Sequence, residues 1–423
     1  MEYEKVQALL GGAKRFGEKA GLIKPARLSE LLGNPQTQLS FVHIAGTNGK
    51  GSTAAYLSNV LMRAGYTVGL YTSPFIYEFN ERMRVNGENI SDDALLFVME
   101  KVRAAAEQMK DEGTGYPTEF DMITAAAFYY FAEMQCDIVV LEVGLGGRFD
   151  ATNIINTPLV SVITKLGLDH TQYLGDTIGK IAFEKCGIIK EGGVTVTLSS
   201  QNTEALAVIQ KESEERNNRL ILCEKEELSD CKTSGDGNQF SWKGTHYRTS
   251  LCGAYQLENA HLALCVLEEL KKQGFAISED AVKQGLYETR WSGRMEKISE
   301  SPLVVIDGAH NPDGMRAFVR AAKEFSKGKK TVCVVAMMKD KEVLPTLSEL
   351  SGFTDTVIFT TVENPRAMAP EELIETSKGL FSDCSMCDNP KEALKQAVKL
   401  ADREGTVFVV GSLYLIREIK EKA

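Results

Sequence analysis

The sequence predicts an α/β protein with mainly parallel sheets. Short apolar runs recur along the chain and alternate with segments of helical spacing, which is typical of a parallel sheet covered by helices. Several of these runs end in glycine, serine or an acidic residue, where parallel strands commonly present functional groups. With 423 residues, the chain exceeds one ordinary core, so we expect two or three domains.

The composition limits the kind of partner and the compartment. Charged residues make up 25% and apolar residues 43%, which is typical of a globular protein in water, and the net charge of −10 gives no general attraction to nucleic acid or anionic membranes. No apolar run reaches membrane-spanning length and the first residues lack a signal-peptide pattern, so we expect a cytoplasmic protein. Nine scattered cysteines predict free thiols, and the isolated Cys384–Cys387 pair is weak evidence for a metal or redox site.

A glycine-rich stretch at 39–55 predicts a phosphate-binding loop. An apolar strand runs into two glycines, a lysine, a third glycine and a serine that begins a helix. Backbone amides, the positive end of the helix and the lysine would together hold a nucleotide triphosphate. The strict GxxxxGK[ST] pattern is not met, because Ile44 replaces its first glycine and Gly51 separates Lys50 from Ser52. An ordinary turn with a solvated lysine is the alternative. The residues predicted here to bind the nucleotide are Gly46, Thr47, Asn48, Gly49, Lys50, Gly51 and Ser52.

Residues 1–297 are predicted to form an N-terminal P-loop-type ATPase domain. Between 75 and 90 the pattern is irregular with a turn at Asn86-Gly87, and from 194 to 249 it weakens, with a small antiparallel sheet expected around Trp242. The predicted helices are 2–20, 52–63, 91–110, 118–134, 176–190, 259–272 and 278–288, and the predicted strands are 39–45, 67–73, 137–142 and 158–167.

Residues 298–423 are predicted to form a smaller Rossmann-like domain. Charged and small residues at 296–302 interrupt the pattern and suggest a boundary. The predicted strands at 303–306, 331–338, 355–362 and 405–412 alternate with helices, and a helix ends the chain. The last strand ends in Gly411-Ser412, but without GxGxxG it does not predict a second dinucleotide site.

Polar residues at the ends of four N-terminal strands predict one shared site. They are Lys50 with Ser52, Thr72 with Ser73, Glu142, and Asp169 with His170. Ligands of open parallel sheets bind beyond the carboxyl ends of the strands. Serine and glutamate oxygens suit Mg²⁺, whereas the spacing alone favours a hydrogen-bonded loop histidine for His170.

Nine motifs in order resemble the folylpolyglutamate synthase and dihydrofolate synthase family of the Mur ligase superfamily, and they span nearly the whole chain. They are GTNGKGS, TSPF…FNERMRVNG, LEVGLGGRFDATN, DHTQYLGDTIGKIAFEKCGIIK, GAYQLENAHLAL, RWSGRMEKI, DGAHNP, MMKDK and GSLYL.

The resemblance implies ATP-dependent amide bond formation between a folate and L-glutamate. The γ-carboxylate of the folate would take the γ-phosphate of ATP, and the amine of L-glutamate would attack the acyl phosphate. By similarity, Lys50, His170 and Lys185 are catalytic, and Ser73, Glu142, His170 and Lys185 bind Mg²⁺. Lys185 resembles the lysine that carries a carbamate in this family, whereas its sequence context alone predicts a lysine on a helix surface.

The family pattern also places four residues at the nucleotide, in a cleft between the domains: Asn259, Arg294, Asp307 and His310. Without the resemblance, Asp307 suits a cap at a strand end and Arg294 a solvated linker charge.

Three positions depart from the family pattern. Phe75 stands where many members have histidine, Ser292 replaces a proline before Gly293-Arg294, and Cys186 replaces an alanine after Lys185. We take from them a mild preference for polyglutamylation of reduced folates, with dihydrofolate synthesis from dihydropteroate as an alternative. A peptidoglycan-precursor ligase and a nucleotide-dependent switch are less favoured, and we expect a monomer.

Overall fold

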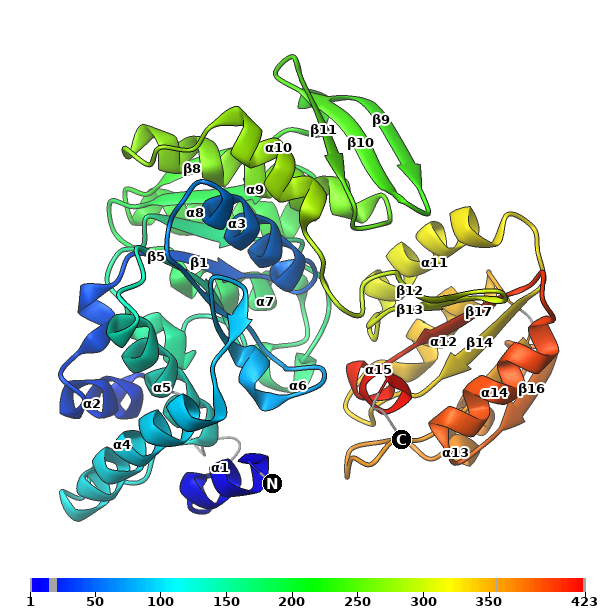
Figure 1. The fold of residues 1–423 in the computed structure, drawn as a ribbon, viewed down its shortest axis with the longest axis horizontal. Coiled ribbons are helices and arrows are strands. Elements are labelled where there is room, and N and C mark those ends of the chain that lie inside the picture. Colours follow the sequence, from blue (N-terminus) through cyan, green and yellow to red (C-terminus); the bar gives the residue numbers. More distant parts are fainter. Residues whose placement is uncertain (1, 15–20, 355, 421–423) are drawn as a thin grey trace. The chain divides into compact units, whose positions relative to one another are not determined.

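The computed structural model describes residues 2–14, 21–354 and 356–420 (Figure 1). The chain folds into two compact units. Unit 1 comprises Met1–Leu166, Thr177–Lys225 and Asn259–Leu286, and unit 2 comprises Gly167–Asp176, Glu226–Glu258 and Tyr287–Ala423. This division differs from the predicted one, because residue 297 lies inside a strand of unit 2 and two earlier segments also belong to that unit.

Unit 1 contains an eight-stranded sheet in the order β4-β3-β2-β5-β1-β6-β7-β8. The six strands β2, β5, β1, β6, β7 and β8 run parallel to one another. Strand β3 pairs antiparallel with both β2 and β4. The strands are β1 (Phe41–Ala45), β2 (Val68–Tyr71), β3 (Met83–Val85), β4 (Glu88–Asn89), β5 (Ile138–Glu142), β6 (Val160–Ile163), β7 (Val194–Leu198) and β8 (Arg219–Cys223). β1 lies between β5 and β6, which explains its buried residues.

Helices cover this sheet. α4 and α5 share one apolar core with β1, β2 and β5, and α7 and α8 share a second with β1 and β6. α3 packs on β1, β2 and β5, and Gly285 of α10 lies against Val60 of α3. The helices are α1 (Glu2–Leu10), α2 (Ile23–Leu31), α3 (Lys50–Arg63), α4 (Asp92–Asp111), α5 (Glu119–Glu133), α7 (Ile178–Lys185), α8 (Thr203–Glu215), α9 (Tyr255–Lys272) and α10 (Glu279–Glu288).

Unit 2 contains a six-stranded sheet in the order β12-β13-β17-β14-β15-β16, antiparallel only at β12. α11 and α12 share an apolar core with the sheet, and α14 packs on β14, β15 and β17 (Figure 1). The elements are β12 (Glu296–Glu300), β13 (Leu303–Ile306), α11 (Pro312–Ser326), β14 (Thr331–Val335), α12 (Val343–Ser351), β15 (Thr356–Phe359), α13 (Pro370–Thr376), β16 (Asp383–Met386), α14 (Pro390–Ala401), β17 (Thr406–Val410) and α15 (Leu413–Lys420).

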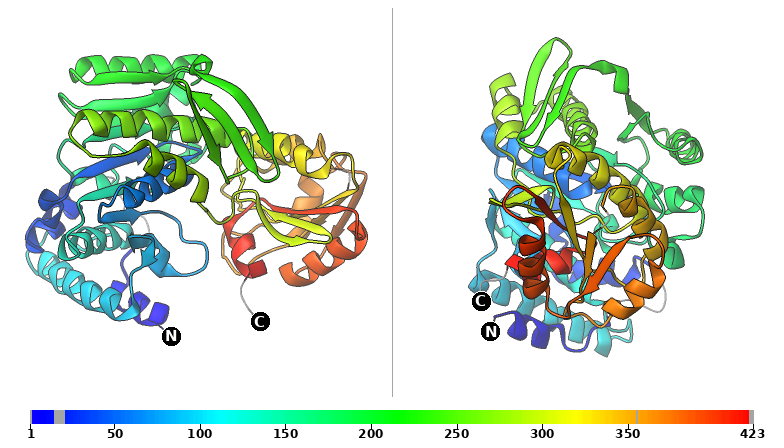
Figure 2. Two further views of the ribbon diagram at one scale, coloured as in Figure 1. Left: turned by 45° about the horizontal axis from the view of Figure 1, so that its top comes forward. Right: turned by 90° about the vertical axis from the view of Figure 1, so that its right-hand side faces the viewer.

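Unit 2 also includes a small antiparallel sheet and one short helix. The sheet confirms the prediction for this segment and consists of β9 (Leu228–Ser234), β10 (Gly237–Trp242) and β11 (Thr245–Thr249), seen in green in Figure 2. The helix is α6 (Thr171–Leu174), directly after His170.

The predicted α/β fold is confirmed, with local differences. The stretch 75–90, expected to be irregular, contains the 3-10 helix η2 (Phe79–Arg82) and the β3–β4 hairpin. Between 194 and 225, β7, α8 and β8 were not predicted, and the interruption at 296–302 is strand β12. Residues 15–20 of the predicted first helix and residue 355 of a predicted strand lie outside the described residues. No described helix is long and apolar enough to cross a membrane.

Candidate active site

The loop between β1 and α3 is packed too tightly to accept side chains at two glycines. Gly46 has φ +152°, and a Cβ there would lie 1.8 Å from Oγ1 of Thr164. Gly49 has φ +93°, and a Cβ there would lie 2.3 Å from Oδ1 of Asn259. Both glycines are therefore required by backbone conformation and by space. Asn259, predicted from the family pattern to lie at the nucleotide, contacts the predicted phosphate-binding loop.

The loop is also anchored to the segment that follows β6. The backbone amides of Thr47 and Asn48 both donate to the carbonyl oxygen of Lys165, at 3.1 and 3.0 Å. The sequence predicts that successive amides of the loop face an anion, and these two amides do not, because both donate to Lys165. The amides of the first turn of α3 remain suited to that role, because helical hydrogen bonding does not use them.

Charged side chains converge beside this loop. The ammonium group of Lys50 donates to the carbonyl oxygens of Gly46 at 3.1 Å and Thr47 at 3.4 Å, and lies 3.9 Å from Oε1 of Glu142. The backbone amide of Ser73 donates to Oε2 of Glu142 at 3.3 Å. Strands β1, β2 and β5 thus bring Lys50, Ser73 and Glu142 together at the carboxyl edge of the sheet, where the strand-end rule places a ligand.

Lys185 also reaches this cluster. It is the last residue of α7, is only 6% exposed, and donates from Nζ to the carbonyl oxygen of Gly46 at 2.9 Å. The alternative of a helix-surface lysine is therefore wrong. Helical spacing in the sequence gives no sign that this end of α7 is buried against the loop.

The donor set beside the loop suits Mg²⁺. Glu142 is 4% exposed, and its carboxylate accepts from the backbone amide of Ser73 beside a loop suited to phosphate. Mg²⁺ accepts few protein oxygens and takes waters and phosphate oxygens for the rest of its octahedron, so this arrangement fits the ion.

Three residues beyond Ser73 form an aromatic and cationic cluster that the sequence analysis did not find as a unit. The guanidinium carbon of Arg82 lies 5.3 Å from the ring centre of Phe75 and 5.5 Å from that of Phe79. Nε and Nη1 of Arg82 are buried and have no hydrogen-bond partner among the described residues. A half-buried guanidinium group with unused donors is suited to a carboxylate.

A buried histidine lies in the strand behind the loop. His43 of β1 is fully buried, and its Nε2 lies 2.9 Å from the hydroxyl oxygen of Thr152, which donates to Asp150 at 2.6 Å. Burial, helped by the charge of Lys190, lowers the pKa of His43 to about 3. Burial raises the pKa of Asp150.

Unit 2 contains a second cluster of predicted residues, centred on Asp169. The carboxylate of Asp169 lies 2.6 Å from Nζ of Lys341 and 3.6 Å from Nε2 of His310. Nζ of Lys341 lies 3.3 Å from Nε2 of His170, and Nδ2 of Asn311 donates to Asp169 at 3.3 Å. Burial alone would raise the pKa of Asp169, but the hydrogen bond and charge of His310, with the charges of Lys341 and His170, outweigh it and hold the pKa far below its usual range.

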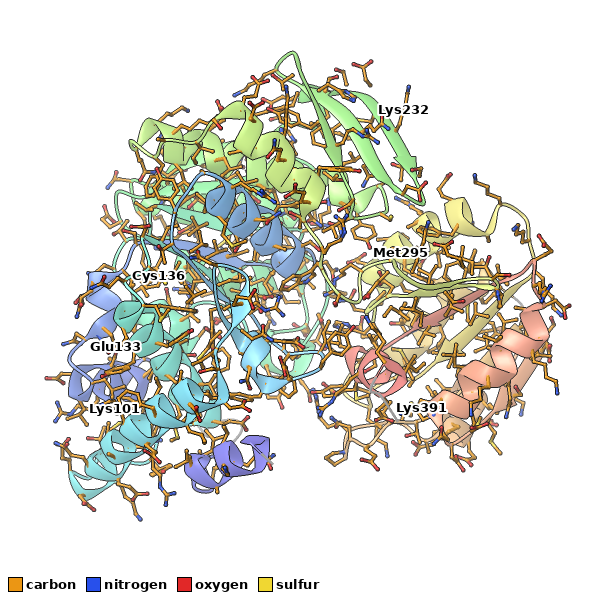
Figure 3. The ribbon with its side chains drawn as sticks, viewed as in Figure 1. Lys101, Glu133, Cys136, Lys232, Met295 and Lys391 are labelled. Atoms are coloured by element: carbon orange, nitrogen blue, oxygen red, sulfur yellow. The ribbon has the colours of Figure 1, made fainter. Side chains whose placement is uncertain are left out.

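A third group surrounds Asp307, directly after β13. Asp307 accepts hydrogen bonds from the backbone amides of Met295 and Ala309, both at 2.9 Å, and from the hydroxyl group of Tyr255 at 3.3 Å. Met295 is labelled in Figure 3. Burial raises the pKa of Asp307, while the nearby charge of Arg294 lowers it. Asp307 thus accepts more hydrogen bonds than a simple cap at a strand end would.

The structure therefore groups the predicted residues within each unit. Unit 1 brings together Lys50, Ser73, Glu142, Lys185 and the loop glycines, with Asn259 against Gly49. Unit 2 brings His170 near His310 through Asp169, and Arg294 near Asp307. The sequence analysis missed Lys341 and Arg82, although both lie in quoted motifs. Cys384 is exposed, and neither it nor Cys387 belongs to a group of metal-binding side chains among the described residues.

Comparisons with known proteins agree on the class of the protein. Residues 44–267 match the Mur ligase middle domain, and residues 293–413 match the Mur ligase glutamate ligase domain. The fold and the loop beside Glu142 are thus those of a Mur-type ligase.

Curated relatives and solved structures identify the branch. A Bacillus subtilis dihydrofolate synthase/folylpolyglutamate synthase is 37% identical over 99% of both chains, and a Lacticaseibacillus casei folylpolyglutamate synthase is 35% identical over 100% of this chain and 98% of the relative. The Mycobacterium tuberculosis folylpolyglutamate synthase complexed with ADP and AMPPCP has 29% identity, a TM-score of 0.91 and full coverage of both chains. The chain belongs to the folylpolyglutamate synthase and dihydrofolate synthase family.

Proposed function

We propose that this chain joins L-glutamate to the γ-carboxylate of a reduced folate, at the expense of ATP and through an acyl phosphate. The observation that carries the proposal is the convergence of Lys50, Glu142, Ser73 and Lys185 on one glycine loop in a chain of this family. Structures of relatives were solved with ADP and AMPPCP, and that of E. coli FolC, 29% identical with a TM-score of 0.87, with DHPP and ADP.

The residues beside the loop would divide the work. Lys50 and the first-turn amides of α3 would bind the terminal phosphates and neutralise the charge that develops during transfer. Glu142 and Ser73, with Lys185 as a carbamate, would hold magnesium, which neutralises phosphate charge when bound. The assignment of His170 as a further magnesium ligand stays a prediction. Lys50 and Glu142, 3.9 Å apart, would orient each other before ATP binds.

Two further sets of residues would bind the substrates. Arg82 has unused donors and lies over two phenylalanine rings, so it is suited to a folate, which combines flat rings with carboxylates. The assignments of Asn259, Arg294, Asp307 and His310 to the nucleotide stay predictions, as do the monomeric state and the cytoplasmic location.

A second candidate activity is the synthesis of dihydrofolate from dihydropteroate and L-glutamate. The B. subtilis relative carries both activities in its name. The two activities differ in which carboxylate is activated, that of dihydropteroate or the γ-carboxylate of a folate, while the ATP chemistry is the same.

Mass spectrometry of the products tests both activities. The purified protein is incubated with ATP, magnesium and L-glutamate, in parallel with dihydropteroate and with tetrahydrofolate. We expect glutamate additions to tetrahydrofolate, and conversion of dihydropteroate as well if the enzyme is bifunctional. If neither acceptor gains glutamate while ATP is hydrolysed, the proposal is wrong.

A further inference from the structure

A buried cluster of two cysteines and one histidine lies in unit 1, outside every group described above. It comprises Cys223, His261 and Cys265, with exposed fractions of 1%, 1% and 6%. The two sulfur atoms and one ring nitrogen all lie within 4.8 Å of one another. Two thiols and an imidazole are the donor set of many zinc sites.

The fold builds this cluster from one strand and one helix. Cys223 is the last residue of β8, the edge strand of the large sheet. His261 and Cys265 are four residues apart on α9 and therefore lie on the same face of that helix. A chain segment of 37 residues or more separates the strand from these helical residues, so local sequence alone does not produce the cluster.

A second contact fixes how α9 lies along β8. Arg219, at the start of the strand, forms an ion pair with Glu269, which also pairs with Lys272 at 2.5 Å. The strand start thus faces the later part of the helix, while the strand end at Cys223 faces its earlier part. The Arg219–Glu269 ion pair at one end of β8 and the cluster at its other end agree on this register. The approach of the three donor atoms therefore follows from the packing of β8 and α9.

We propose that Cys223, His261 and Cys265 bind a zinc ion that ties β8 to α9. Bond lengths of about 2.3 Å to sulfur and 2.0–2.1 Å to nitrogen require donor separations of roughly 3.4–3.8 Å in a tetrahedral site. The donors lie within 4.8 Å of one another, so shifts of about 1 Å bring them into that range. Two thiolates balance the charge of Zn²⁺, which favours a buried site, and the soft donors disfavour Mg²⁺ and Ca²⁺.

The cluster contains a histidine, and this distinguishes a metal site from a thiol pair. A disulfide between Cys223 and Cys265 would use no imidazole and would need an oxidant. A metal ion uses all three donors and leaves its fourth position for a water molecule or a backbone oxygen.

The site would support the loop described above. Asn259, which contacts Gly49, lies two residues before His261 on α9. An ion that holds His261 and Cys265 to β8 would therefore also hold the part of α9 that contacts the phosphate-binding loop. We assign the site a structural role, because its three side chains are almost fully buried.

Cobalt titration of the reduced, metal-free, full-length protein tests this proposal without measuring activity. Cobalt bound by thiolates gives sulfur-to-metal charge-transfer absorption and the intense visible bands of a tetrahedral ion. We expect these bands to saturate at one equivalent and to disappear when zinc is added. We also expect zinc to raise the midpoint of thermal unfolding by about 5 °C.

Variants with matched controls locate the site. Cys223→Ser and Cys265→Ser should each abolish the charge-transfer band, and His261→Asn should weaken cobalt binding at least about tenfold. Cys136→Ser is the control, because Cys136, labelled in Figure 3, is also buried in unit 1 but lies in the core that α4 and α5 share with the sheet. It should bind cobalt as the unchanged protein does. Circular dichroism verifies that each variant is folded, and the titration of the unchanged protein does not depend on any variant.

Three results would overturn the proposal. The first is the absence of a thiolate-to-cobalt band in the unchanged protein. The second is equal loss of the band in Cys136→Ser and Cys223→Ser. The third is formation of a Cys223–Cys265 disulfide, seen as a loss of two hydrogens on mild oxidation, in a protein that binds neither cobalt nor zinc.

Discussion

The charged groups of units 1 and 2 are positioned by different means. In unit 1 the loop is fixed by close backbone packing: Gly46 lies against Thr164, Gly49 lies against Asn259, and two loop amides donate to Lys165. In unit 2 the group around Asp169 is held mainly by charge, with Asp169 between Lys341 and His310. Unit 1 should therefore be sensitive to added volume, and unit 2 to the loss of a charge.

The largest expected effect is the loss of charge beside the loop. Glu142→Gln and Lys50→Ala should each lower turnover by about a thousandfold or more, because phosphoryl transfer depends on positioned charge. Steady-state release of phosphate measures the effect. Lys24→Ala is the control, because Lys24 also donates to a backbone carbonyl oxygen in unit 1, that of Tyr116 at 3.0 Å. Nearly normal turnover in Glu142→Gln would contradict its proposed role.

Lys185→Ala separates a metal-binding carbamate from a simple cation. We expect turnover to fall by about a hundredfold, and small carboxylates added to the assay to restore at least a tenth of it by replacing the carbamate. Full activity without added carboxylate would rule out the carbamate. Rescue by small amines instead would show that the cation itself is needed.

Gly46→Ala tests the sensitivity of unit 1 to volume. A methyl group there meets Oγ1 of Thr164 at 1.8 Å, so we expect about a hundredfold lower kcat/KM for ATP, because misplacement of the loop by about 1 Å has effects of this size. Gly65→Ala is the control, since Gly65 also has a positive φ, +93°, but nothing within 4 Å. It should cost about 1–2 kcal/mol of stability and little activity. Equal effects of both changes on kcat/KM would show that close packing is unimportant.

Asp169→Asn tests the dependence of unit 2 on charge. The change leaves Lys341 without its buried carboxylate partner, so the free energy of unfolding should fall by about 3 kcal/mol in urea titrations. Asp236→Asn, which breaks an exposed pair with Lys297, should cost less than about 1 kcal/mol.

The pH dependence of Asp169→Asn has a defined sign. The pKa of Asp169 is lowered in the folded protein, so its stabilisation is present above the unfolded pKa of about 4 and is lost as the pH falls below it. The stability difference between the two proteins should therefore shrink as the pH falls below about 4. A difference that grows in acid would contradict the charge pairing.

His43→Gln should have the smallest effect at neutral pH and a growing one in acid. The pKa of His43 falls from 6.5 to about 3 on folding, so the unfolded chain binds the extra proton and the folded protein loses stability as the pH drops below about 6.5. Relative to His43→Gln, the unchanged protein should lose about 2–3 kcal/mol between pH 7 and pH 4.5. If the urea midpoints of the two proteins change in parallel over this range, folding does not lower the pKa of His43.

The sequence predicted the central strands well because their burial leaves a clear pattern. β1 and β5 are short, wholly buried and bounded by glycine or charge, and β13 was predicted at its observed limits. The edge strands left weaker signals. β16 is exposed along its length and β12 is rich in charge, so neither has the apolar run of a buried strand.

Site residues could be predicted from the sequence where a single strand or loop determines their position. Glu142 was found because a carboxylate at the end of a buried strand needs a partner. Lys341 was missed because it lies 171 residues from His170, and only the fold brings the two together. The burial of Lys185 against Gly46 depends on tertiary packing in the same way.

The most direct test of the proposed reaction follows an oxygen atom. A folate labelled with ¹⁸O in its γ-carboxylate is incubated with the protein, ATP, magnesium and L-glutamate, and the released phosphate is analysed by mass spectrometry. If the carboxylate attacks the γ-phosphate and the amine then displaces phosphate from the acyl carbon, each phosphate carries one labelled oxygen from the folate. Unlabelled phosphate accompanying amide formation would contradict the acyl phosphate and the role assigned to the loop.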